Sequence, residues 1–138
     1  MKNILISLLI VVLMLPACTS KTSEIHAISG QEFSLAIGQT AVISGENVSV
    51  KFTDVVGDSR CPDGVMCVWA GQVSCSLDVV KSGAASQMVI TAPGDTTDYT
   101  DNTYQNYRLQ FRVDPYPQSG KKINKSDYRL FLIIHKNP

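Results

Sequence analysis

Apolar and polar residues alternate with a period of two along most of the chain after residue 30, as in half-buried β-strands. The clearest run places Tyr107, Leu109, Phe111 and Val113 on one face, with charged or polar residues between them. Shorter runs of the same kind occupy residues 31–37, 40–44, 48–53, 73–79 and 88–90. No stretch after residue 30 keeps a helical period.

The last run, DYRLFLIIH at residues 127–135, is apolar at every position from Leu130 to Ile134, as expected for a strand covered on both faces. Glycine- and proline-containing turns separate the runs. Seven short strands of this kind predict an all-β fold, an antiparallel β-sandwich, with a small β-barrel as the alternative.

The first 17 residues, MKNILISLLIVVLMLPA, have the features of a secretion signal. Lys2 precedes an apolar run from Ile4 to Leu15, which is shorter than the about 20 residues of a membrane-spanning helix. The following LPAC, residues 15–18, resembles the lipobox of bacterial lipoproteins, in which the chain is cut before the cysteine. The resemblance implies that Cys18 carries lipid and anchors the protein to a membrane.

The residue after Cys18 indicates in which membrane the lipidated protein would be anchored. Thr19 stands where, by the same resemblance, an aspartate would retain a lipoprotein at the inner membrane. We therefore expect an outer-membrane location in the cell envelope, facing the periplasm or the exterior. Residues 19–27 are small and polar, so residues 18–29 are predicted to be the lipidated N-terminus and a flexible tether, and residues 30–138 one folded domain.

Size and charge narrow the functional classes. The chain has 138 residues with 12 basic and 12 acidic side chains, and it has no basic run. The electrostatic signature of nucleic-acid binding is missing, so that class is set aside. A domain this small buries only one modest core, so an additional covalent constraint would add a sizeable share of its stability.

Three cysteines remain once Cys18 is assigned to lipid, and export places them in an oxidising compartment. Cys61 and Cys67 flank a Pro-Asp-Gly turn at residues 62–64 that can bring the two sulfurs together, which predicts a disulfide. Cys75 is in phase with the apolar residues of its strand, which predicts a buried, reduced thiol.

The segment DSRCPDGVMCVWAG, residues 58–71, resembles a signature of small exported bacterial proteins, many of them lipoproteins. The signature reads Asp-Ser-Arg-Cys-Pro, four residues, then Cys-x-Trp-Ala-Gly. The similarity extends to residues 33–43, 48–56 and 127–134, which covers most of the mature chain. It implies a shared fold and export, and it implies no particular activity.

Redox and metal chemistry find little support in this pattern. Cys61 and Cys67 lack the Cys-x-x-Cys spacing of reactive pairs, and only Arg60 lies nearby to lower a thiol pKa, so a structural bridge is the favoured interpretation. A zinc site needs four well-placed ligands, and His26 and His135 lie near opposite ends of the chain. We predict neither a metal nor a cofactor.

Acid–base catalysis is equally unsupported. A nucleophile needs a base within reach, and neither histidine is well placed to be one. Asp58 and Asp63 are more typical of turn caps than of a catalytic pair. Residues 95–102 are acidic but lack the ligand spacing of a calcium loop. The sequence therefore predicts a protein that is not an enzyme.

Arg60 and Trp69 are the best candidates for a binding site, with Asp58 and Asp63 beside them, because arginine and tryptophan are enriched at binding hot spots. The competing interpretation buries Trp69 over the disulfide and pairs Arg60 with Asp58 or a backbone carbonyl. We expect that truncating Trp69 destabilises the domain and that truncating Arg60 does not.

The sequence thus predicts a lipid-anchored, non-catalytic binding or structural module. Its partner would be an envelope protein or a glycan, contacted through the disulfide-bonded loop or through residues 92–106. A loop that inhibits exported proteases is a narrower form of this hypothesis. The alternative is an exported enzyme or a thiol–disulfide redox protein using Cys61 and Cys67.

Overall fold

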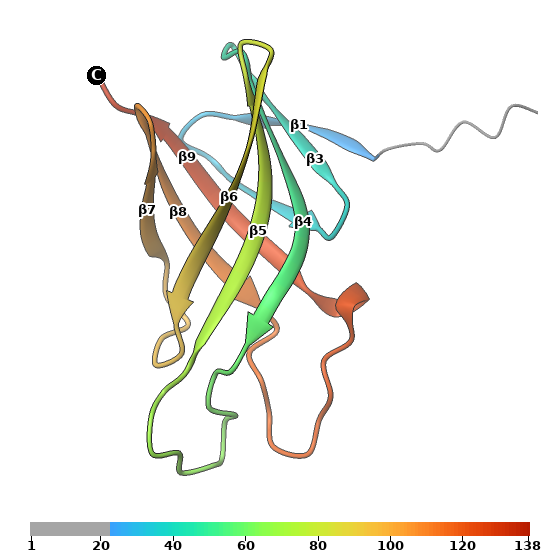
Figure 1. Cartoon of the computed structure of the whole chain (residues 1–138), viewed down its shortest axis with the longest axis vertical. Helices are drawn as coiled ribbons and strands as arrows, with labels where there is room; N and C mark the ends of the chain where they lie inside the picture. Colours follow the sequence, from blue (N-terminus) through green and yellow to red (C-terminus); the bar gives the residue numbers. More distant parts are fainter. Residues whose placement is uncertain (1–22) are drawn as a thin grey trace, which may run out of the picture.

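Nine strands in two sheets form most of residues 23–138, the part of the chain that this computed structural model describes (Figure 1). The strands are β1 Glu24–Ile28, β2 Glu32–Ala36, β3 Thr40–Ser44, β4 Val48–Asp58, β5 Gln72–Lys81, β6 Ala84–Pro93, β7 Thr100–Tyr104, β8 Tyr107–Asp114 and β9 Arg129–Lys136. A 3-10 turn, η2 Lys125–Asp127, precedes β9. Within residues 23–138 no helix is long and apolar enough to cross a membrane. The predicted signal sequence and Cys18 lie outside the described residues.

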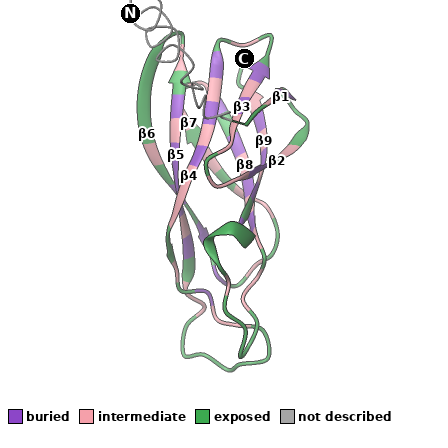
Figure 2. Cartoon of the chain, turned by 90° about the vertical axis from the view of Figure 1, so that its right-hand side faces the viewer, coloured by how far each residue is buried: buried purple, intermediate pink, exposed green. Residues whose placement is uncertain are grey.

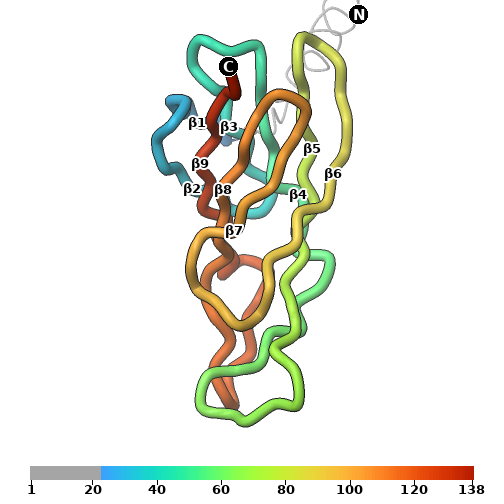
Figure 3. The backbone as a smooth tube through the Cα atoms, turned by 90° about the vertical axis from the view of Figure 1, so that its left-hand side faces the viewer, coloured from blue at the N-terminus to red at the C-terminus, as the bar shows by residue number. Residues whose placement is uncertain are grey.

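The strands form two sheets that face one another across a common core (Figures 1 and 3). One sheet has the order β1-β3-β4-β5-β6 and the other β2-β9-β8-β7, and the two are not closed into a barrel. The predicted β-sandwich is therefore confirmed. All strand pairs are antiparallel except β1 with β3, which run parallel.

The period-two pattern correctly identifies the faces that form the core. Tyr107, Leu109, Phe111 and Val113 of β8 are all buried, and the inner faces of the other strands contribute the rest of the core (Figure 2). Strand β9 is buried on one face only. Its other face, which includes Phe131, is half-buried, with the Arg112 guanidinium 3.8 Å above the Phe131 ring.

The predicted tether needs a correction, because the folded region begins at β1 rather than near Gly30. Glu24 pairs with Thr40 of β3 and Ile28 pairs with Ser44. Ala27 is buried, and Ile25 packs against the core. This strand is short, and only Ile25 and Ala27 alternate inward, so it does not stand out in the sequence.

The predicted loop at residues 92–106 is also partly wrong. It contains β7, which pairs with β8 through a tight hairpin in which Gln105 adopts a positive φ of 52°. Strand β7 is mostly polar and lies at a sheet edge, so it shows no alternation of apolar residues.

Three loops meet at one end of the sandwich, opposite the turns that join β3 to β4 and β5 to β6 (Figures 1 and 2). They comprise residues 59–71, which we call the stapled loop, residues 94–99, and residues 115–124. This loop end carries all four residues predicted from the sequence as a candidate binding site.

Candidate functional site

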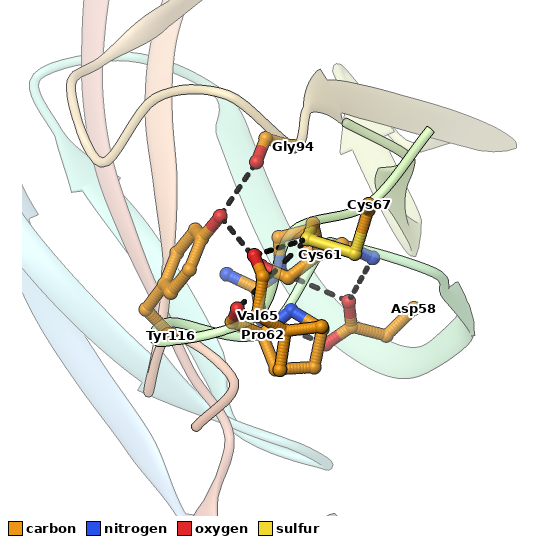
Figure 4. Close-up of a disulfide and its surroundings, with 8 residues drawn as sticks. Asp58, Cys61, Pro62, Val65, Cys67, Gly94 and Tyr116 are labelled. Atoms are coloured by element: carbon orange, nitrogen blue, oxygen red, sulfur yellow. Dashed lines mark hydrogen bonds and ion pairs between the residues drawn. A yellow bond between two sulfur atoms is a disulfide. The ribbon is translucent and has the colours of Figure 1, made fainter. Parts of the chain in front are cut away.

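A disulfide between Cys61 and Cys67 closes the stapled loop, as predicted (Figure 4). The bridge joins the two sides of the loop across the exposed residues between them. It divides the loop end into two parts. The buried part next to the strands, centred on Asp58 and Arg60, we call the base, and the other part is exposed.

Arg60 forms the centre of the base, with only 6% of its surface exposed. Its Nε and Nη2 donate to the two carboxylate oxygens of Asp58 at 2.9 and 2.7 Å. Its remaining donors reach the backbone carbonyl oxygens of Val113 at 2.9 Å and Pro115 at 3.0 Å. The guanidinium therefore joins the stapled loop to the end of β8 from the inside.

Asp58 completes this buried pair. It accepts a hydrogen bond from the Tyr128 hydroxyl at 3.0 Å and another from the Arg60 backbone at 3.2 Å. Burial alone would raise the pKa of Asp58, but the hydrogen bonds and the charge of Arg60 outweigh it and lower the pKa below its usual value. Burial, reinforced by the Asp58 carboxylate, raises the pKa of Tyr128 to about 12.

Tyr116 links all three loops and was not among the residues predicted from the sequence. Its ring lies against the Arg60 guanidinium, 5.3 Å from the ring centroid. Its hydroxyl can donate to the carbonyl oxygen of Gly94 at 2.6 Å or to that of Cys61 at 3.0 Å (Figure 4). An aromatic residue between two prolines just after a strand was the only sequence signal for this role.

Backbone contacts bring the loops closer than any side chain would allow. Gly94 donates from its backbone to the Gly71 carbonyl at 2.9 Å. A Cβ atom on Gly94 would lie 2.2 Å from the Ala70 oxygen, and one on Gly71 would lie 1.8 Å from the Ser59 oxygen. Gly71 also has a positive φ of 73°. Both positions therefore require glycine.

The outer part of the stapled loop is apolar and exposed. Trp69 is 71% exposed, and Met66 and Val68 are fully exposed, with Val65 beside them. We call these four residues the apolar tip. The competing interpretation is wrong in burying Trp69 over the disulfide, because the loop turns the side chain outward. It is correct in pairing Arg60 with Asp58 and with backbone carbonyls.

Two adjoining hollows of about 490 and 430 Å3 lie beside the apolar tip. All four tip residues line the first hollow, and Asp63, Asp95 and Tyr116 line both. Among residues 23–138, neither Asp63 nor Asp95 takes part in an ion pair. The hollows thus combine apolar side chains with two carboxylates that have no cationic partner.

The other groups with chemical potential lie away from the hollows. Cys75 is free and fully buried, as predicted, and burial raises the pKa of its thiol to about 12. His26 lies on β1 and His135 on β9, both remote from the loop end. Across the described part of the chain, no three His, Cys, Asp or Glu residues are grouped closely enough to hold a metal ion.

The four predicted binding residues thus fall into two groups. Asp58 and Arg60 belong to the base, where they are occupied by each other and by backbone carbonyls. Asp63 and Trp69 belong to the exposed outer part and line the first hollow.

Comparison with known protein families, curated proteins and solved structures finds no match, so the site rests on the residues of this chain.

Proposed function

We propose that this protein is a lipid-anchored, non-catalytic module of the cell envelope that binds a macromolecular partner through the apolar tip. The observation that carries the proposal is the exposure of Val65, Met66, Val68 and Trp69 together on one short loop. Clustered exposed apolar side chains on a small domain are typical of interaction sites.

The base of the loop favours binding because it fixes the tip before a partner arrives. The disulfide closes the loop, and Arg60, paired with Asp58, fixes the start of the loop to the end of β8. A loop that is already ordered loses less conformational entropy on association. Trp69 supplies the kind of large aromatic anchor that dominates binding energies, and Met66 can adapt to an irregular surface.

The burial of the groups with the most shifted pKa values supports a binding role over catalysis. The groups whose pKa values depart furthest from normal, Cys75 and Tyr128, are buried in the core and in the base rather than facing a hollow. Catalytic groups are usually perturbed and accessible at the same time. A protease-inhibiting loop is a narrower version of the same proposal, and inhibition assays with exported proteases test it.

The envelope location is supported by sequence and by the disulfide, which is compatible with an oxidising compartment. Cys18→Ser should move the protein from the membrane fraction to the soluble fraction. Continued membrane association of that variant would contradict a lipid anchor at Cys18.

The decisive experiment compares partners of the full-length protein in its own envelope after chemical cross-linking. Trp69→Ala should remove the co-purifying partner while leaving the fold intact, as checked by circular dichroism. The matched control is Val89→Ala, which truncates an apolar side chain that is 54% exposed on β6, away from the loop end. Identical partners for wild type and both variants would refute binding through the tip.

Thiol–disulfide exchange remains a second candidate, because Cys67 is exposed and an exposed bridge can be attacked. Arg60, the cation next to Cys61 in the sequence, is already paired with Asp58, so it gives little help to a thiolate. Equilibration with glutathione buffers tests this candidate. A structural bridge should stay oxidised down to potentials of about −300 mV, whereas a redox-active one would open well above that.

A further inference from the structure

We infer that the apolar tip and the hollows beside it form one site for a protein segment that carries a lysine or arginine flanked by apolar residues. This inference rests on the proposed function and names the chemistry of the partner. The tip would contact the apolar residues, and Asp63 and Asp95 would bind the cation.

The charges around the hollows favour a cation. Asp63 and Asp95 are the charged residues that line them. The positive charge of Arg60 is buried and neutralised by Asp58. Lys121 and Lys122 belong to the 115–124 loop but do not line either hollow. The lining therefore carries negative charge without compensation, and a cationic side chain would gain charge-assisted hydrogen bonds there.

The apolar and acidic parts are close enough to act together. Asp63 and Val65 belong to the same short loop, and Trp69 and Asp95 line the same hollow from two different loops. The exposed indole of Trp69 also offers a ring face to a cation. A segment that places one apolar side chain on the tip therefore brings the next few residues over the carboxylates.

The composition of the tip favours a protein over a glycan. Sugars bind flat aromatic faces flanked by hydrogen-bonding groups, and Trp69 is the single aromatic residue of the tip. The other three members are aliphatic side chains, which match the apolar side chains of a protein. Salt should weaken the carboxylate contribution and leave the apolar contribution, because exposed charges are screened.

A peptide selection tests the inference directly. The full-length lipidated protein, held in lipid nanodiscs, is screened against a displayed library of random peptides. We expect the enriched peptides to carry lysine or arginine next to apolar residues. Their binding can be titrated through the fluorescence of Trp69, because this is the single tryptophan of the chain.

Charge variants then assign the cation to its site. Asp63→Asn and Asp95→Asn should each weaken the selected peptides about fivefold, within the range of exposed ion pairs. The matched control is Asp98→Asn, which removes the same charge from an exposed residue of the 94–99 loop that lines neither hollow. This control should leave the affinity unchanged.

The remaining outcomes separate the two proposals. No enrichment, enrichment of acidic or uncharged peptides, or equal binding by all three charge variants would overturn the inference. If Trp69→Ala still loses its envelope partner in those cases, the proposed function stands. A response of Trp69 to chitin oligosaccharides without peptide binding would overturn the inference in favour of a glycan. If Trp69→Ala retains every partner, the proposed function fails as well.

Discussion

The base and the tip of the stapled loop both lie between Asp58 and Trp69 and are opposite in physical character. At the base, Arg60 is buried, and its donors are paired with Asp58 and with backbone carbonyls. At the tip, Trp69 and Met66 are exposed and contribute little to the core. The charged residue is structural, and the large aromatic residue is available for binding.

This difference shows that residue type alone does not distinguish a residue available for binding from one that stabilises the loop. Arginine and tryptophan are both enriched at binding hot spots, but one of them is fully occupied in this loop. Burying an ion pair makes each partner depend on the other, because removing one leaves an uncompensated charge. The base and the tip should therefore respond to mutation in opposite ways. The burial of Arg60 and the exposure of Trp69 reverse the expectation from the sequence that truncating Trp69 destabilises the domain and truncating Arg60 does not.

The largest expected effect is on the base. Arg60→Ala leaves the buried Asp58 carboxylate and two backbone carbonyls without their donor, so we expect a loss of about 3 to 5 kcal/mol in the free energy of unfolding. Urea denaturation measures it. The control is Arg108→Ala, whose pair with Asp101 is exposed and should cost less than about 1 kcal/mol. Equal small losses for both variants would show that the base is not held by its ion pair.

The disulfide should contribute somewhat less. Replacing Cys61 and Cys67 by serine removes a link that closes a loop of about seven residues, which on the chain-entropy estimate costs about 2 to 2.5 kcal/mol. The domain should remain folded, because the backbone contacts of Gly71 and Gly94 persist. Thermal unfolding with and without a reductant gives the same quantity for the wild type. Complete unfolding on reduction would mean that the base cannot hold the loop by itself.

Lowering the pH should reduce the free energy of unfolding contributed by the base of the loop, by less than the mutation of Arg60 does. Because the folded-state pKa of Asp58 is lowered, its contribution to stability is present above the unfolded-state pKa of about 4 and is lost as pH falls through the folded-state pKa. Because other carboxylates are protonated in the same pH range, the quantity to measure is the difference in the free energy of unfolding between wild type and Asp58→Asn. The stability gap between wild type and Asp58→Asn should narrow as pH falls below about 4. A gap that is constant with pH would contradict the assignment.

The smallest effect on stability is expected at the tip. Trp69→Ala should change the free energy of unfolding by less than about 0.5 kcal/mol, because the side chain is mostly exposed. The contrasting variant is Phe52→Ala, which truncates a fully buried aromatic ring and should cost about 3 to 5 kcal/mol. A large loss for Trp69→Ala would place the indole in the core and remove the apolar tip.

Much of the fold could be predicted because buried strand faces impose a period of two. Strands β8 and β4, the disulfide and the buried Cys75 all follow from alternation and from turn residues. Strands β1 and β7 did not, because both are short and lie at sheet edges, where few apolar residues are needed.

The site was harder to predict than the fold. The exposure of Trp69 and the burial of Arg60 are set by the path of an irregular loop, which has no period to read. The role of Tyr116 depends on contacts with Cys61 and Gly94, 55 and 22 residues away. The sequence pattern indicated this segment as a candidate, and three-dimensional contacts between loops decide which of its side chains are exposed.

The parallel pairing of β1 with β3 also defines a mechanical path. If lipid at Cys18 holds one end of the protein and a partner holds the tip, tension enters through β1, crosses to β3, and follows β4 to Asp58. The β1–β3 ladder joins only five residue pairs at the edge of its sheet, whereas β5 and β6 share ten. Under load, β1 would detach first and lengthen the predicted tether, so the tip would stay bound to its partner while the domain moved away from the membrane.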